Sequence, residues 1–168
     1  RRVLFRSASH LHPGILPLQM PVGSGKEFRG VVDLISQRFF VWEGEFGEDI
    51  RSAELSSEHK RNAFEKRRNL IERLADHDDG IAESFLADEG IGQELLISAI
   101  RRLTIEGKVV PAFCGSALKN MAVQPLIDGI IDFLPSPEES VTEQAGKKNR
   151  EPVSINVACD PNETLLAF

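Results

Sequence analysis

The segment that most restricts the fold of this chain is an apolar run, residues 109–114, followed by a turn of small residues, Gly115-Ser116-Ala117. A near-continuous apolar run predicts a strand buried on both faces. Pro111 cannot donate to a ladder, so we place it at an edge or strand end. After the turn, apolar residues recur at helical spacing and end before two prolines, which predicts a helix over residues 123–134. Its expected apolar face consists of Val123, Leu126, Ile127, Ile130, Ile131 and Leu134.

A strand, a turn and a helix in this order form the repeating unit of a doubly wound α/β sheet. In such sheets ligands bind beyond the carboxyl ends of the strands, where small residues let backbone N–H groups approach a ligand. The turn at Gly115 is therefore a candidate ligand-binding loop. Taken alone, its small residues fit close packing of a strand on a helix equally well.

The upstream region shows a different pattern. The β-prone runs 16–22, 28–35 and 38–42 are separated by turn-forming residues, which predicts a small sheet. Amphipathic segments at 58–77, 81–87 and 93–106 predict helices that cover it, the first capped by Ser56 or Ser57 and the third ended by Gly107. The expected inner face of the first helix consists of Ala63, Phe64, Leu70, Ile71, Leu74 and Ala75, and its outer face of Arg67, Arg68, Glu72 and Arg73. The third helix carries Leu95, Leu96, Ala99, Ile100 and Leu103 at helical spacing.

Composition narrows the function classes. The formal net charge of −6 gives no overall basic surface for nucleic acid, so any RNA contact would be local. Cys114 and Cys159 lack C-x-x-C spacing, which indicates neither a disulfide framework nor a zinc site and favours a reducing compartment. No apolar run approaches the roughly 20 residues that span a bilayer, so no membrane partner is expected.

Several other motifs have ordinary explanations. The sequence Gly23-Ser24-Gly25-Lys26 is not a phosphate loop, because Met20 stands where that motif needs glycine and Glu27 where it needs Ser or Thr. We predict a hairpin turn. The histidine-containing clusters His10-Leu11-His12 and His77-Asp78-Asp79 lack a complete metal-ligand set. The carboxylates that could form an acid/base pair, but fit surface charge better, are Asp76, Asp78, Asp79 and Glu83.

A basic stripe on the first helix offers a local contact for RNA phosphates or an acidic protein. It consists of Arg61, Lys66, Arg67 and Arg68. Such a stripe is more often a solvated face, and Glu65 and Glu72 can pair with it.

Both ends of the chain look cut. The sequence Arg2-Val3-Leu4-Phe5-Arg6-Ser7 resembles a translated sequencing adapter, so we expect residues 1–14 to be non-native or unplaced, with a genuine basic strand as the alternative. At the other end Leu165-Leu166-Ala167-Phe168 stops in mid-strand. We therefore expect a fragment.

Five stretches together resemble the end of the GTPase domain of the elongation factor G family. They are Val109-Val110-Pro111-Ala112-Phe113-Cys114-Gly115-Ser116-Ala117-Leu118-Lys119-Asn120, Val123-Gln124-Pro125-Leu126, Leu134-Pro135-Ser136-Pro137, Leu16-Pro17-Leu18-Gln19-Met20-Pro21-Val22-Gly23 and Phe28-Arg29-Gly30-Val31-Val32-Asp33-Leu34. Met121-Ala122 departs from the usual Lys-Gly of the family.

This resemblance implies an α/β fold: the C-terminal part of a P-loop GTPase domain, a doubly wound sheet with an inserted α+β subdomain. The implied boundaries are 15–107 for the inserted subdomain, 108–137 for the end of the GTPase domain, 138–163 for a linker with a weak strand at 153–158, and 164–168 for the start of a β-barrel domain.

In that family the Gly-Ser-Ala loop is the fifth guanine-nucleotide motif. The resemblance implies that the backbone N–H groups of Ser116 and Ala117 reach guanine O6, that Leu118 flanks the base, and that Gly115 belongs to the same wall. The phosphate, switch and Asn-Lys-x-Asp motifs of the family precede residue 15. We therefore assign no catalytic or metal residue here, and expect neither tight nucleotide binding nor GTP hydrolysis from this segment alone.

The resemblance implies a parent protein that uses GTP or GDP with Mg²⁺, works as a monomer on the ribosome through rRNA and ribosomal stalk proteins, and acts in translocation or ribosome recycling. Motifs such as Ala75-Asp76-His77-Asp78-Asp79 look closer to mitochondrial members, especially the recycling branch, which predicts the mitochondrial matrix, with the cytoplasm as the alternative.

Two other hypotheses stay open from sequence. One is a non-catalytic protein-binding module that uses the helical layer 58–106. The other is an unrelated hydrolase with Ser116 as nucleophile, although the Gly-x-Ser-x-Gly context is absent.

Overall fold

A computed structural model describes residues 14–44, 47–87, 90–136, 139, 142–148 and 151–157. The chain divides into two compact units, Arg1–Leu134 and Pro135–Phe168. The predictions for residues 1–13, including His10 and His12, and those for Cys159 and residues 164–168 fall outside the described residues.

The first unit contains a four-stranded antiparallel sheet, which confirms the small sheet predicted upstream. Its order is β2-β3-β4-β5, with β2 at Gln19–Val22, β3 at Gly30–Asp33, β4 at Phe39–Glu43 and β5 at Asp49–Ala53. β5 was not predicted from sequence. All five of its residues are exposed, so it has no apolar alternation to reveal it.

The two tight connections of this sheet have the predicted turn character. The glycine-rich sequence after β2 contains a 3₁₀ turn, Gly25–Glu27, and joins β2 to β3. A Cβ on Gly23, where φ is +84°, would lie 1.9 Å from the Glu27 carbonyl oxygen, so the turn requires glycine. After β3, the Asp33 carboxylate accepts hydrogen bonds from the Ser36 backbone N–H at 2.6 Å and the Ser36 hydroxyl at 2.7 Å.

A second, parallel pair of strands joins the beginning and end of this unit. β1 (Ile15–Pro17) pairs with β6 (Val110–Ala112). The single strand predicted over residues 16–22 is therefore wrong: it is two strands in two sheets, divided at Leu18. The Leu18 N–H donates to the Ala112 carbonyl, whereas the Leu18 carbonyl accepts from the Leu34 N–H.

β6 differs from the prediction in its burial. Val110 is exposed, and Pro111 and Ala112 are half-buried, so a strand buried on both faces is wrong for the described residues. Among the described strands β6 has one neighbour, β1, which leaves its other edge and part of its surface uncovered. Pro111 lies in an edge strand of this part of the chain, as its missing N–H predicts.

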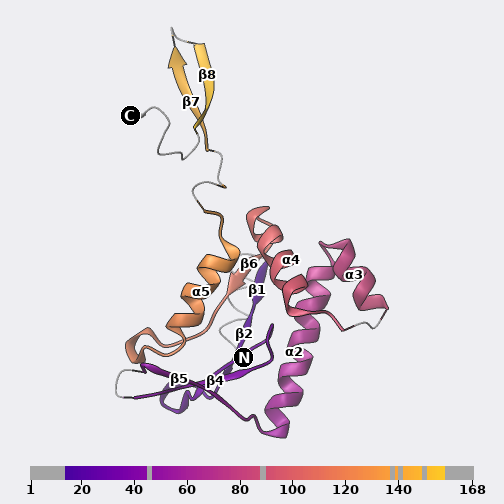
Figure 1. Ribbon diagram of the computed structural model, residues 1–168, viewed down its shortest axis with the longest axis vertical. Coiled ribbons are helices and arrows are strands. Elements are labelled where there is room, and N and C mark those ends of the chain that lie inside the picture. Colours follow the sequence, from indigo (N-terminus) through magenta and orange to yellow (C-terminus); the bar gives the residue numbers. More distant parts are fainter. Residues whose placement is uncertain are drawn as a thin grey trace. The chain divides into compact units, whose positions relative to one another are not determined.

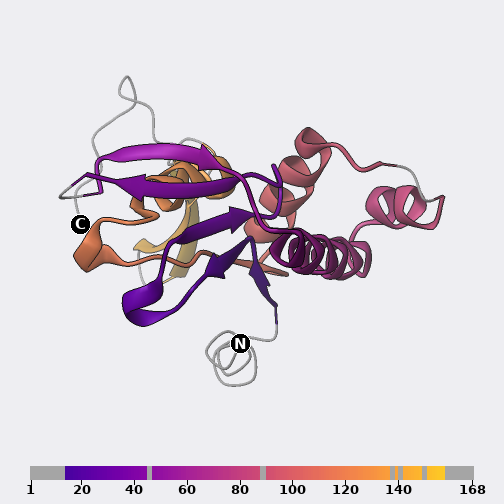
Figure 2. The same cartoon turned by 90° about the horizontal axis from the view of Figure 1, so that it is seen from below.

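Four helices occur where amphipathic spacing predicts them. They are α2 (Ser57–Ala75), α3 (Asp79–Leu86), α4 (Gln93–Ile105) and α5 (Val123–Phe133). In Figures 1 and 2, α2 and α3 lie side by side at one end of the four-stranded sheet, whereas α5 lies near β4 and β5. Ser56 caps α2 by accepting the His59 N–H, and α4 ends before Gly107 at a φ of +71°.

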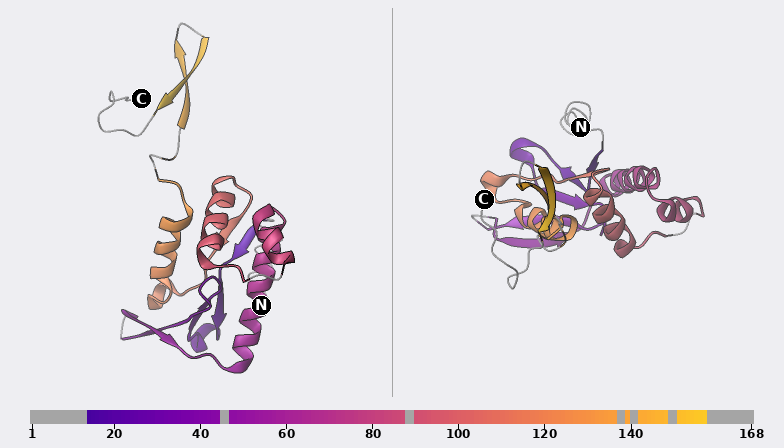
Figure 3. Two further views of the ribbon diagram at one scale, coloured as in Figure 1. Left: turned by 45° about the vertical axis from the view of Figure 1, so that its right-hand side comes forward. Right: turned by 90° about the horizontal axis from the view of Figure 1, so that it is seen from above.

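The main core lies between the sheets and helices α2, α3 and α4. Leu16 and Leu18 contribute to it from the strands, and fully buried Leu74, Ile81 and Ile100 from the helices. α5 adds Phe133, whose ring lies 6.5 Å from that of Phe113 after β6. Figure 3 shows α4 between α5 and α2.

The predicted faces of α2 need correction at two positions. Phe64 is 65% exposed, whereas Arg67 is 9% exposed. The Arg67 guanidinium donates through Nη1 to the carbonyls of Leu34 and Ile35, and through Nη2 to that of Ile91 at 3.0 Å. Burial lowers the pKa of Arg67 from its ordinary value, and the nearby Asp33 carboxylate opposes that shift.

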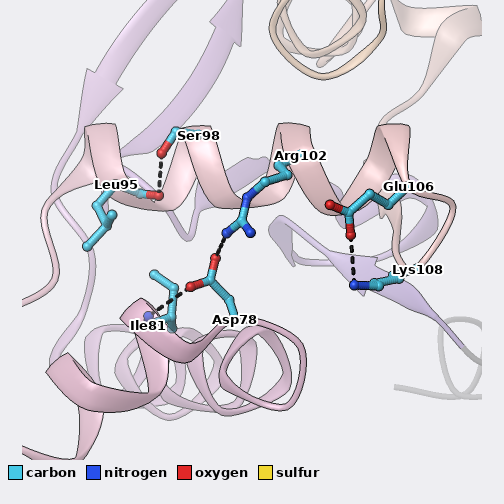
Figure 4. A network of polar contacts seen from close by, with 7 residues as sticks. All are labelled: Asp78, Ile81, Leu95, Ser98, Arg102, Glu106 and Lys108. Carbon is cyan, nitrogen blue, oxygen red and sulfur yellow. Dashed lines mark hydrogen bonds and ion pairs between the residues drawn. The ribbon is translucent and has the colours of Figure 1, made fainter.

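Asp78 is also not the surface charge that the sequence suggested. It is buried and caps α3 by accepting the Ile81 N–H at 3.0 Å. Its other carboxylate oxygen pairs with Arg102 of α4, as Figure 4 shows. The acidic turn therefore joins two helices.

The apolar face predicted for α5 is present but uncovered in the described residues. Leu126, Ile127, Ile130, Ile131 and Leu134 are each between 43% and 70% exposed. The helix is buried instead through Gly129 and Phe133. No helix in the described residues has the length and apolar character required to cross a membrane.

The second unit contains a β-hairpin. β7 (Thr142–Lys148) pairs antiparallel with β8 (Glu151–Val157). The weak strand expected at 153–158 overlaps β8, whereas β7 was not expected, and the assignment of residues 138–163 as a linker stays a prediction. Charged, proline-containing composition hid the pairing.

Candidate functional site

The loop after β6 is closed on itself by backbone hydrogen bonds. The Ser116 N–H donates to the Met121 carbonyl at 2.9 Å, and the Met121 N–H donates to the Ser116 carbonyl at 3.0 Å. Between them lies a 3₁₀ turn, Ala117–Lys119, and Asn120 and Ala122 adopt left-handed conformations with φ of +51° and +64°. These bonds and turns give residues 115–122 one defined shape.

Gly115 lies at the start of this loop, where the two ends of the loop come close together. A Cβ at this position would lie 2.6 Å from the Met121 carbonyl oxygen and 3.1 Å from the Ala122 Cβ. The small residue predicted from sequence is therefore required for closure, because backbone would have to move to admit a side chain.

The loop leaves two backbone donors without an acceptor among the described residues, the N–H groups of Ala117 and Leu118. The Ser116 N–H, which the family resemblance also directed at a ligand, is taken by Met121. The Leu118 side chain is 99% exposed. The loop thus presents two adjacent donors and one apolar side chain to its surroundings.

A second set of residues, missed from sequence, holds the other side of the loop. Trp42 of β4 is buried with Val31 and Ala122, and its indole N–H donates to the Gln124 side-chain oxygen at 3.1 Å. Gly47 lies so close that a Cβ would be 2.7 Å from the Lys119 carbonyl oxygen. The single tryptophan was the available signal, since a buried indole N–H needs an acceptor.

Cys114, immediately before the loop, contacts the buried side chain of Gln19, which lies 95 residues earlier in the sequence. Its N–H donates to Gln19 Oε1 at 3.2 Å, and its Sγ lies 4.0 Å from the same oxygen. Burial raises the pKa of Cys114 to about 11, so its thiol is neutral at neutral pH.

The competing sites found in the sequence gain no support from the described residues. Ser116 Oγ makes no hydrogen bond to a histidine or carboxylate there, so it lacks the base that a hydrolase nucleophile needs. No group of three or more His, Cys, Asp or Glu side chains in this part of the chain is arranged to hold a metal ion.

The basic stripe on α2 is interrupted. Arg67 is buried, whereas Arg68 pairs with Glu72 at 3.3 Å and lies 5.8 Å from the centre of the Phe85 ring. The stripe therefore does not form a continuous cationic surface, and the expected pairing with Glu72 is present.

Comparison with known proteins identifies relatives of this chain. No family model matches the chain. Elongation factor G-1, mitochondrial, of Arabidopsis thaliana is 37% identical over 167 residues, which is 99% of this chain and 22% of that protein. Elongation factor G of Thermotoga neapolitana is 41% identical over 122 residues, 73% of this chain and 18% of its own length. The chain belongs to the elongation factor G family.

A solved structure supports the same fold. The crystal structure of a protein from Thermus thermophilus superposes with a TM-score of 0.70 at 26% identity, covering 84% of this chain and 21% of that one. This likeness confirms the predicted α/β class for the elongation factor G segment. The chain spans about a fifth of the length of its curated relatives, between 18% and 22%. The relatives do not favour the alternative of a non-catalytic module built on residues 58–106.

Proposed function

We propose that this chain is a segment of a ribosome-associated translational GTPase and that residues 115–118 form one wall of its guanine pocket. The observation that carries the proposal is the pair of N–H groups on Ala117 and Leu118, which have no acceptor within the described residues. The kinship with elongation factor G supplies the class of ligand.

The donors suit guanine for a chemical reason. Guanine carries an acceptor, O6, at the position where adenine carries an amino donor. Two fixed N–H donors would meet O6 favourably, whereas adenine would leave both unpaired in a desolvated site, and unpaired polar groups give strong discrimination. In this proposal the Ala117 N–H is the main O6 donor and exposed Leu118 covers the base.

GTP or GDP with Mg²⁺ is the cofactor that the family implies. The N–H groups of Ala117 and Leu118 suit the base edge of the nucleotide, and other parts of the protein would hold the phosphates and Mg²⁺. When bound, GTP supplies the phosphoanhydride whose hydrolysis drives the cycle. This chain's own loop binds and orients the base and rejects adenine.

The proposed partner is the ribosome, contacted through rRNA and stalk proteins by a monomer, in translocation or ribosome recycling. The Arabidopsis relative, named as mitochondrial, supports the matrix as the compartment, and bacterial relatives of 41% and 42% identity support the cytoplasm to the same degree.

The test uses the complete protein that contains this segment and two nucleotides, GTP and 2-aminopurine riboside triphosphate, which lacks O6. Ala117→Pro removes one N–H at a position that tolerates proline, because Ser116 before it is extended and Ala117 begins a 3₁₀ turn. We expect GTP affinity to fall about tenfold and affinity for the analogue to stay constant. Ala117→Ser, which retains the N–H, is the control.

Equal affinity of the unaltered protein for GTP and for the analogue would contradict the proposal. So would a loss in Ala117→Pro that is the same for both nucleotides, because a general distortion of the site would explain it.

A further inference from the structure

Gln19 is a buried polar residue that the fold alone does not explain. It is 2% exposed at the start of β2, and its Nε2 amide group has no hydrogen-bond partner among the described residues. Leaving a buried donor unpaired is costly, so an amide at this position needs a compensating role.

The orientation of the amide is fixed by its other end. Gln19 Oε1 accepts the backbone N–H of Cys114, 95 residues away in sequence. Turning the amide over would place a donor against that N–H, so the unpaired atom is necessarily Nε2. The Gln19 side chain therefore supplies the acceptor Oε1 to Cys114 and leaves its donor Nε2 without a partner among the described residues.

The geometry of the parallel ladder explains why Cys114 needs this acceptor. In a parallel pair, a residue that donates to one carbonyl accepts from the N–H two positions further along the partner strand. Because Leu18 donates to the Ala112 carbonyl, regular pairing would direct the Cys114 N–H at the Leu18 carbonyl. That carbonyl instead accepts the Leu34 N–H, since the chain turns here into the antiparallel sheet.

Gln19 thus extends the β1–β6 ladder by one rung with a side-chain oxygen. Cys114 is the last residue before Gly115, and Gly115 lies where the two ends of the closed loop, Ser116 to Met121, come together. Fixing the Cys114 backbone fixes the direction in which the chain enters the loop.

We propose that Gln19 is a positioning residue for the guanine-binding loop, setting through Cys114 the direction of the Ala117 and Leu118 N–H groups. This inference rests on the proposed function. It attributes part of the discrimination between guanine and other bases to a residue of the four-stranded sheet that does not touch the nucleotide.

The readout is the ratio of the dissociation constant for 2-aminopurine riboside triphosphate to that for GTP in the complete protein. Gln19→Met keeps the side-chain length and removes both polar atoms, and we expect it to lower this ratio at least threefold. The ratio of the dissociation constant for inosine triphosphate to that for GTP should not change, because inosine retains O6. Gln19→Glu, which keeps an acceptor oxygen, should retain the first ratio.

Leu74→Met is the matched control, a volume-conserving change at a fully buried residue of α2. It should leave both ratios constant. Amide hydrogen exchange provides a second measurement: in Gln19→Met the peptide covering residues 113–118 should exchange at least tenfold faster, while α4 peptides are unaffected.

The outcomes separate the two proposals. If the unaltered protein prefers GTP to the analogue but Gln19→Met changes neither the ratio nor the exchange, the role of Gln19 is wrong and the proposed function stands. If the unaltered protein shows no such preference, the guanine-binding role of the loop is wrong, and the positioning role is overturned with it.

Discussion

Arg67 and Arg68 are adjacent on α2 and look equivalent in sequence, yet the structure places them in opposite environments. Arg67 is 9% exposed and donates to three backbone carbonyls, whereas the Arg68 side chain is 64% exposed. The same substitution at both positions, arginine to methionine, therefore compares the two environments, because arginine and methionine have similar helix propensities and methionine replaces the apolar stem in both cases.

The expected losses follow from the contacts. Hydrogen bonds to a charged group contribute about 1.5–3 kcal/mol each, and the three bonds of Arg67 share one guanidinium, so their contributions do not add in full. Because removing one partner of a buried charged contact costs about 3–5 kcal/mol, we expect Arg67→Met to lower the free energy of unfolding by that amount. Arg68→Met removes an exposed pair with Glu72 and a cation–π contact with Phe85, together about 1 kcal/mol or less.

The assay is equilibrium urea unfolding of the 168-residue chain, followed by the fluorescence of Trp42, its single tryptophan. That indole is 8% exposed, so unfolding should shift its emission. Arg67→Lys, which keeps the charge but not the planar fork, should fall between the two methionine variants. Equal losses in Arg67→Met and Arg68→Met would refute the reasoning.

Two further predictions concern the surroundings of the loop. Since burial raises the pKa of Cys114 to about 11, its alkylation by iodoacetamide in a Cys159→Ser background should be slow at pH 8 and should accelerate toward pH 11; a rate that levels off near pH 9 would contradict this. Because the pKa is raised, the folded state binds the Cys114 thiol proton more tightly than the unfolded state does. The resulting contribution to the free energy of unfolding is complete below about pH 9 and is lost as the pH rises toward 11. Gly129→Ala should lower stability by about 1–3 kcal/mol, because the new Cβ would lie 2.2 Å from Phe113 Cζ, whereas Gly80→Ala in α3, whose nearest atom is 3.4 Å away, should be neutral or stabilising in the same urea titration.

Local sequence determined the helices, caps and turns of this protein. Ser56 caps α2, Gly107 follows α4, and the turn at Asp33 closes with Ser36, all as their residue types predict. Each of these features depends on atoms within a few residues, so a single stretch of sequence contains the relevant physics. The shape of the loop at Gly115 also depends on nearby residues, because the hydrogen bonds that close it join Ser116 to Met121.

Tertiary structure decided which faces and which polar groups are buried. Helical spacing placed Phe64 inside and Arg67 outside, but the carbonyls that accept from Arg67 lie in the β3–β4 turn and before α4. The division of the chain at Leu18, and the use of Gln19 as an acceptor for Cys114, arise only where two sheets meet. Amphipathic spacing records the preferences of one element, whereas burial is set by partners that are 24 to 95 residues distant in sequence.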